Sequence, residues 1–400
     1  MANILVFFVV LLAALLFPLL LRGLHIPWVI ALIIAGVILG PSGLEIVAGD
    51  PVIDFLSQIG IVFLMFMAGL ETGFSRLKQL GKTSTSIAAA NGLIPFGVGT
   101  LITLYFGYGV ETAIVIGAAF MSSSVAVVLP TLESNGMMDT KIGSTVISSV
   151  VLQDLSSLIV LGSLIHQSQS GSNLPLHLFV ISIFTSIAFL KLVIPKLKEF
   201  LEYEDREIRG KGFETELRMV IVILIGVVAF YEVIGLHSIV SGFLAGLFLS
   251  DIIQHEDIIN KIHAIGYGIF IPIFFIEVGS SFEIQALTNL TSTALMAGAI
   301  ILGTTLSKFF SGYFASRVND FSVPESSFIA STSLPQLSTA LAVAYLGIQT
   351  GIIDQNLMTS VLLLSIVTTA LSSFLINRTY DWMDEDGETR LESNFLSRFT

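Results

Sequence analysis

Three ionisable residues lie inside long apolar stretches of this 400-residue chain: Asp154, Glu277 and Lys308. A charge at the centre of a hydrocarbon layer costs at least about 2.5 kcal/mol, so each of the three needs a physical reason to be there. Carboxylate oxygen is a hard ligand that suits alkali cations. A single carboxylate can hold either a proton or such a cation, and competition between the two ions for it would by itself produce exchange.

Each of these charges also has a purely structural interpretation. Asp154 could hydrogen-bond a neighbouring helix, and Lys308 could be a counter-charge that stabilises the fold. Glu277 lies nearer the end of its apolar run, which suits an outer vestibule as well as a coupling role or a pair with Lys308. We predict that Asp154, with the preceding Gln153, binds a proton or a K⁺ or Na⁺ ion, and that Lys308 and Glu277 are coupling groups or counter-charges.

Two apolar runs are interrupted by hydroxyl-bearing residues and proline. The interrupting residues are Ser122, Ser123 and Ser124 in the first run, and Ser333, Pro335, Gln336 and Ser338 in the second. Proline removes a backbone hydrogen bond, and hydroxyl groups can satisfy the freed carbonyls or coordinate an ion. Kinked helices with packed serine and threonine are the alternative. A pair of broken helices in matching positions favours a transport site.

The composition places these residues in a membrane protein. Hydrophobic residues make up 54% of the chain and charged residues only 12%, about half the share of a soluble domain. A water-soluble core of this size would need more polar surface than the sequence provides. Cysteine is absent, which excludes disulfides and cysteine-ligated metal. The first apolar run lacks signal-peptide features, so we expect it to be a retained helix.

The apolar runs predict an all-α membrane protein with thirteen transmembrane helices, each of about 20 residues. The predicted spans are 3–21, 27–44, 54–74, 84–106, 112–132, 142–165, 174–195, 215–234, 236–252, 262–281, 288–314, 324–347 and 357–377. With the N-terminus outside, every one of the 18 basic residues except Lys308 falls on the cytoplasmic side. We therefore expect a multi-pass protein of a prokaryotic inner or cell membrane with a cytoplasmic C-terminus.

The two halves of the chain repeat short motifs in the same order, such as Gly23-Leu24-His25 and Gly235-Leu236-His237. The matching spans are seven helices apart, and because seven is odd the second copy must cross the membrane in the opposite sense. Inverted six-helix repeats with two discontinuous crossing helices are typical of secondary transporters. Coincidental similarity in a receptor or channel is the alternative. The predicted parts are the first repeat (1–166), a linking helix and cytoplasmic loop (167–214), the second repeat (215–378) and a short cytoplasmic tail (379–400).

Several segments resemble the monovalent cation:proton antiporter-2 family, which includes Kef-type potassium/proton systems and NapA-like sodium/proton antiporters. The resemblance covers about residues 20–380. The segments that carry it are Gly40–Leu44, Gly60–Glu71, Ser122–Leu132, Gln153-Asp154, Pro272–Gly279 and Lys308-Phe309.

The resemblance implies a NapA/NhaA-like homodimer in which a core domain moves past a dimerisation domain. It makes Asp154 the ion- and proton-binding carboxylate, and it matches Lys308 to a lysine that faces a carboxylate pair in NapA-like members. Gln153 stands where electrogenic members carry Asp, which favours electroneutral exchange. The segment Leu334–Ser338 stands where many relatives carry Gly-Glu, so the resemblance supports no role there. The nucleotide-binding domain of Kef-type systems is missing, so a separate regulatory subunit is expected.

The predicted function is secondary antiport of K⁺ or Na⁺ against H⁺ by alternating access, without enzymatic activity, cofactor or nucleic acid. The alternatives are a gated potassium channel-like efflux protein and a transporter-derived ion sensor. No Thr-Val-Gly-Tyr-Gly-like filter sequence is present to support a channel. An intramembrane aspartyl protease would need two membrane carboxylates that share a proton.

Overall fold

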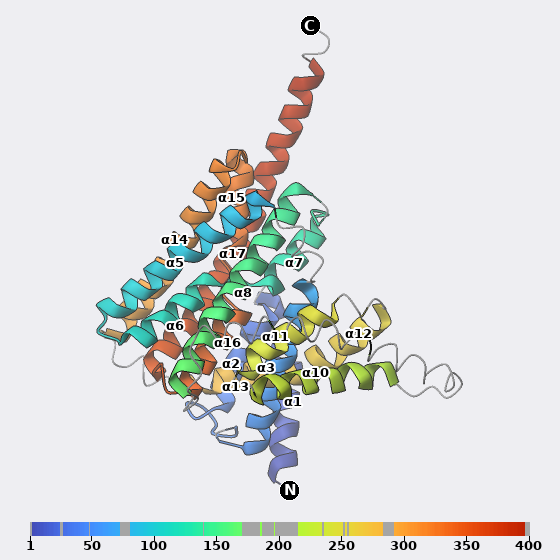
Figure 1. Ribbon diagram of the computed structural model, residues 1–400, viewed down its shortest axis with the longest axis vertical. Coiled ribbons are helices and arrows are strands. Elements are labelled where there is room, and N and C mark those ends of the chain that lie inside the picture. The colour runs from blue at the N-terminus through green and yellow to red at the C-terminus, as the bar shows by residue number, and fades with distance from the viewer. Residues whose placement is uncertain are drawn as a thin grey trace. The chain divides into compact units, whose positions relative to one another are not determined.

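The computed structural model is all-helical in the residues it describes (Figure 1). These residues are 2–24, 27–47, 49–72, 81–138, 140–169, 185, 196, 215–233, 236–250, 253, 256–282 and 292–396. Seven spans in this part of the chain are long and apolar enough to cross a membrane. They lie in α1 (Ala2–Leu21), α3 (Pro51–Thr72), α5 (Lys82–Tyr105), α8 (Lys141–Gln169), the continuous α12–η2–α13 segment, α14 (Ser292–Val318) and α17 (Gln355–Leu396).

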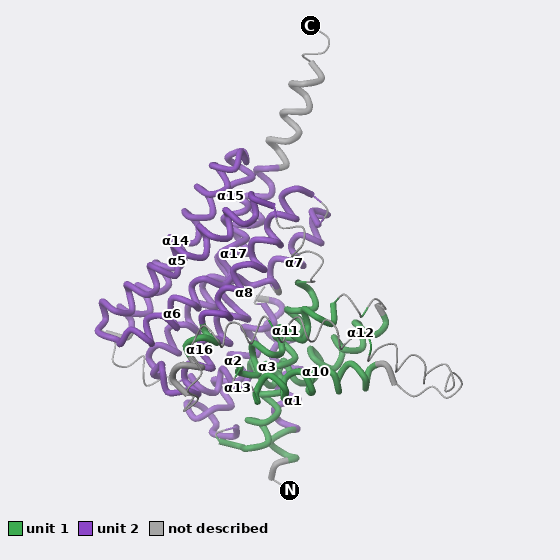
Figure 2. Tube along the Cα trace, in the orientation of Figure 1, with its two compact units in different colours: residues 1–7, 49–79, 161–275 green, residues 8–48, 80–160, 276–400 purple. Residues whose placement is uncertain are grey.

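The chain divides into two compact units (Figure 2). Unit 1 comprises residues 1–7, 49–79 and 161–275. Its described helices are α3, α10 (Thr215–Val233), α11 (Ser238–Leu249), α12 (Glu256–Ile265) and the π-helical turn η2 (Gly266–Phe270), which leads into α13 (Ile271–Ser280). Helix α3 packs along α11, and α10 packs against α11 and α12.

Unit 2 comprises residues 8–48, 80–160 and 276–400. Its remaining helices are α2 (Trp28–Leu39), α6 (Val110–Met121), α7 (Val125–Ser134), α15 (Val323–Thr332) and α16 (Ser338–Gln349). Helix α5 packs against α6 and α14, α14 packs against α15 and α17, and α6 packs against α16. Helices α6 and α16 lie on the same side of this unit, away from α7 and α15 (Figure 1).

Both predicted helix interruptions are present. The run 112–132 forms α6 and α7, which are separated by the non-helical residues Ser122–Ser124. The run 324–347 forms α15 and α16, which are separated by residues 333–337. Pro335 lies in the second break, whereas Pro130 lies inside α7. Hydroxyl groups therefore accompany both breaks, and proline accompanies one.

Some predicted boundaries differ from the structure. The span 27–44 is helical only from Trp28 to Leu39, because the sequence Gly40-Pro41-Ser42-Gly43 turns the chain. Helix α17 continues to Leu396, well into the predicted tail, where no proline interrupts it. The predicted span 174–195 and almost all of the linking segment 167–214 lie outside the described residues. The count of thirteen spans and the inverted repeat stay predictions.

Candidate ion-binding site

The two helix breaks contact each other inside unit 2. The Ser124 amide donates a hydrogen bond to the Pro335 carbonyl (2.8 Å), and the Gln336 side-chain amide donates to the Ser122 carbonyl (2.7 Å). The Ser123 hydroxyl donates to the Ser333 carbonyl (2.9 Å). A helix end leaves backbone groups without partners, and in a membrane these groups must find partners within the protein. Each break therefore supplies hydrogen-bond partners to the other.

Each broken helix has a second half, α7 in one and α16 in the other. The Asp154 carboxylate lies where these two halves begin. It is 1% exposed and accepts a hydrogen bond at Oδ1 from the backbone amide of Ser123 (3.1 Å). The Thr339 side chain also lies close to it. Ser123 lies just before α7, and Thr339 is the second residue of α16. A helix N-terminus favours negative charge, so both half-helices stabilise the ionised carboxylate.

The Lys308 ammonium group lies at the end of the first half-helix, α6. The side chain is 0% exposed and donates hydrogen bonds to the carbonyl of Met121 (2.8 Å), to Ser123 Oγ (2.9 Å) and to Gln153 Oε1 (2.7 Å). Met121 is the last residue of α6, and a helix C-terminus favours a cation. An ammonium group has three N–H donors, and these three acceptors occupy them all.

The predicted site residues divide into two groups. The residues of both breaks, Gln153, Asp154 and Lys308 lie in one buried cluster, in which Ser338 is the first residue of α16. Glu277 is only half-buried on α13, and none of the hydrogen bonds of Lys308 reaches it. The structure therefore places Lys308 against Gln153 and the end of α6, and not against Glu277, which the sequence left open as a possible partner.

Asn91 on α5 belongs to this cluster but was missed in the sequence analysis. Its side-chain amide is fully buried and lies within hydrogen-bonding distance of the Lys308 carbonyl (2.7 Å), Ser311 Oγ (3.2 Å) and Ser333 Oγ (3.2 Å). Gly312 leaves room for this amide, since a Cβ atom there would lie 2.6 Å from it. A lone Asn within the apolar run 84–106 was the available signal, because an uncharged amide in a membrane span also needs a partner.

The first break contributes one further buried oxygen. The Ser124 hydroxyl is buried and has no hydrogen-bond partner among the described residues. Its neighbour Ser123 contacts Asp154 through the backbone. Within the described part of the chain, no group of three or more His, Cys, Asp or Glu residues could hold a metal ion. The donor set is one carboxylate with hydroxyl and carbonyl oxygens, which suits a hard monovalent cation.

Comparisons with known proteins decide the family. Residues 10–380 match the model of the transmembrane part of sodium/hydrogen exchangers. The chain belongs to this family. It is 32% identical over 380 residues to the probable Na⁺/H⁺ antiporter 3 of Methanocaldococcus jannaschii, covering 94% of this chain and 96% of that protein. It is 27% identical over 357 residues to a Na⁺/H⁺ antiporter of Enterococcus hirae, covering 89% and 92% of the two chains.

A solved structure confirms the fold. The sodium proton antiporter MjNhaP1 of Methanocaldococcus jannaschii at pH 8 superposes with a TM-score of 0.64 at 18% identity, covering 96% of this exchanger and 98% of that chain. The predicted multi-pass helical membrane protein is therefore confirmed. Family membership confirms the predicted exchange of a monovalent cation for protons.

The narrower assignment to the antiporter-2 family is not confirmed, since the matching model is that of sodium/hydrogen exchangers. The structure suggests why its motifs discriminate poorly. Gly60 and Gly69, which lie in one of the segments that carry the resemblance, are packing positions against the backbone of Phe270 and Phe243. Helices that approach this closely need glycine whatever ion the protein carries.

Proposed function

We propose that this exchanger moves Na⁺ in one direction and H⁺ in the other through one shared site, the Asp154 carboxylate. The observation that carries the proposal is the position of this side chain. It is almost fully buried, at the N-terminal ends of α7 and α16, where the two broken helices meet. Neither a lipid-facing Asp nor one held only by a neighbouring helix would need two interrupted helices around it.

In the proposed cycle, the carboxylate is either protonated or bound to the cation. The Ser124 hydroxyl supplies a further oxygen ligand to the ion. The hydrogen bond from Ser123 keeps the carboxylate in place in both states. Because the two ions compete for one group, the site crosses the membrane with either a proton or the cation bound. This couples the movement of the cation to the opposite movement of protons.

The same geometry supports electroneutral exchange. Gln153 is an uncharged acceptor for Lys308, so the cluster holds a single carboxylate. One carboxylate carries one proton or one monovalent cation, and the exchange is then one for one. We choose Na⁺ over K⁺ because the two relatives are both named Na⁺/H⁺ antiporters. The predicted homodimer, the external N-terminus and the cytoplasmic C-terminus are part of the proposal.

The direct test is transport by the purified protein in sealed vesicles with an internal pH dye. Wild type should move protons against an imposed Na⁺ gradient, and Asp154→Asn should lose at least about 99% of this flux because Asn cannot exchange a proton for a cation. Asp257→Asn is the matched control, because Asp257 is exposed at the start of α12 and should have no effect.

Four results would contradict the proposal. Cation-driven proton flux retained by Asp154→Asn would remove the carboxylate from the mechanism. A flux driven by K⁺ and not by Na⁺ would overturn the choice of ion. A membrane potential generated by exchange would overturn the one-for-one stoichiometry, and a cation current without proton movement would favour a channel.

A further inference from the structure

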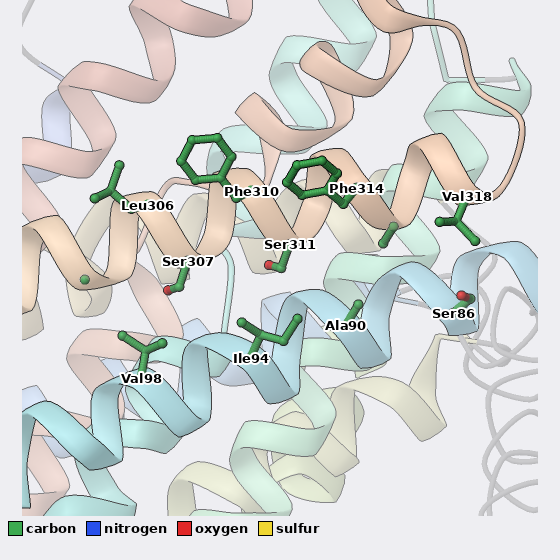
Figure 3. A pocket seen from close by; sticks show the side chains of 12 residues that line it. Ser86, Ala90, Ile94, Val98, Leu306, Ser307, Phe310, Ser311, Phe314 and Val318 are labelled. Carbon is green, nitrogen blue, oxygen red and sulfur yellow. The ribbon is translucent and has the colours of Figure 1, made fainter.

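Helices α5 and α14 enclose an open apolar groove of about 750 Å³ on the surface of unit 2. Figure 3 shows the two helices side by side, with Ala90, Ile94 and Val98 on the edge of α5 that faces α14 and with Ser307 and Ser311 on the facing edge of α14. Ile94 remains 51% exposed although it lines the groove. The groove is therefore open sideways, toward the hydrocarbon that surrounds these two spans.

The two helices run antiparallel, which defines the ends of the groove. At one end the Asn319 side-chain amide, just beyond α14, donates a hydrogen bond to Ser86 Oγ in the first turns of α5 (3.3 Å). At the other end a Cβ atom on Gly303 would lie 3.3 Å from Val98. The lining residues of α14 extend from Gly303 to Val318, which is about 22 Å at 1.5 Å per residue. One leaflet of the hydrocarbon core is about 15 Å thick, so the groove is long enough to hold a lipid chain that crosses one leaflet.

Only one end of the groove carries positive charge. Lys82 begins α5 one turn before Ser86, and Arg317 precedes the lining residue Val318. Both basic side chains are exposed, and the Arg317 guanidinium also donates a hydrogen bond to the Phe321 carbonyl. The opposite end, near Val98 and Gly303, is apolar. A basic end on the side predicted to face the cytoplasm matches the phosphate of an anionic lipid.

We propose that this groove is a binding site for one anionic phospholipid. An acyl chain lies between α5 and α14, and the phosphate lies at Lys82 and Arg317. The floor of the groove includes Ser311, which contacts Asn91, and Asn91 also donates to the backbone of Lys308. A lipid bound here holds together the two helices that carry this contact. The proposal does not depend on which ions the protein exchanges.

The test is lipid retention by the full-length protein in detergent, measured by native mass spectrometry after addition of phosphatidylglycerol or of phosphatidylcholine. Ile94→Trp fills the groove, and Leu93→Trp is the matched control on the preceding residue, which is 61% exposed but does not line the groove. Wild type and Leu93→Trp should retain one more phosphatidylglycerol molecule than Ile94→Trp does. Phosphatidylcholine should be retained less than phosphatidylglycerol.

The double variant Lys82→Gln, Arg317→Gln tests the headgroup. It should lose the preference for phosphatidylglycerol over phosphatidylcholine, whereas Arg22→Gln, at an exposed arginine outside the groove, should keep it. Equal retention of phosphatidylglycerol by Ile94→Trp and wild type would show that no lipid binds in the groove. Equal retention of both lipids by wild type would show that the site does not recognise charge. A dimer that dissociates only in Ile94→Trp would assign the groove to a second copy of the chain.

Discussion

Two pairs of helices in this exchanger are held together in opposite ways. In unit 1, α3 and α11 approach through glycine: a Cβ atom on Gly246 would lie 2.0 Å from the carbonyl oxygen of Phe66, and one on Gly69 would lie 2.2 Å from that of Phe243. In unit 2, the broken helices contact each other through hydrogen bonds of Ser, Gln and Pro residues. The first contact depends on missing side chains, and the second depends on polar ones.

The two kinds of contact have different roles: the close packing of α3 and α11 supports the fold, and the polar contacts of the broken helices form the proposed ion-binding site. Continuous helices satisfy their own backbone groups, so α3 and α11 need only close packing and can remain apolar. Broken helices expose four partial charges, two positive and two negative, inside unit 2. Asp154 lies at the positive ends, and Lys308 lies at one negative end. Among the described residues, these two are the only buried Asp, Glu, Lys or Arg side chains. Interrupting a helix therefore creates a buried position that favours a carboxylate.

The largest effect is expected from glycine substitutions in unit 1. Gly246→Ala should destabilise the protein by at least about 3 kcal/mol or prevent its folding, because the new methyl group meets backbone that cannot move aside. Gly226→Ala on α10 is the matched control: nothing lies within 4 Å of its Cβ position, and it should stabilise by about 0.5–1 kcal/mol. Thermal unfolding in detergent measures both. Similar destabilisation by the two variants would show that close packing is not what α3 and α11 require.

The next effect concerns the polar contact. Lys308→Met keeps the length of the side chain but leaves the Met121 carbonyl, Ser123 Oγ and Gln153 Oε1 without their shared donor. We expect a loss of about 3 kcal/mol in unfolding free energy, since each buried acceptor costs about 1–3 kcal/mol when unpaired and the cluster can rearrange. The same variant should also exchange ions poorly. Unchanged stability would mean that the end of α6 does not need the cation.

The smallest effect is expected outside the membrane spans, where Tyr108 donates a hydrogen bond to Asp354 (3.0 Å). Burial, followed by the nearby Asp354 carboxylate, raises the pKa of the Tyr108 hydroxyl above its ordinary value of about 10. Because the pKa is raised, the stability that this hydrogen bond contributes is fully present below pH about 10 and is lost only as the pH rises beyond that value. Tyr108→Phe should therefore cost at most about 1 kcal/mol, and equally across the neutral range. A cost that varies between mildly acidic and mildly alkaline pH would contradict this.

The same contrast explains what the sequence could reveal. Asp154, Lys308 and the two interruptions were predicted because a polar residue in a long apolar run is conspicuous, whatever it contacts. Whether Lys308 pairs with Glu277 could not be decided from the sequence, because which side chains meet depends on how separate helices pack; in the structure Lys308 contacts Gln153 and the end of α6. Asn91 was overlooked for the related reason that an uncharged amide stands out less than a charge. The close contact of Gly246 with Phe66 was equally hidden, since glycine is common throughout membrane helices.

The central claim is that one carboxylate takes up Na⁺ and H⁺ in turn. The most direct measurement is the release of protons when Na⁺ is added to the purified protein in weakly buffered detergent solution. A ligand that must deprotonate to bind a cation releases its proton on binding, so at a pH low enough for the free carboxyl group to be protonated we expect about one proton per bound Na⁺, and a Na⁺ affinity that falls as the pH is lowered. Asp154→Asn should show neither effect. Na⁺ binding without proton release in wild type, or unchanged release in Asp154→Asn, would contradict the account.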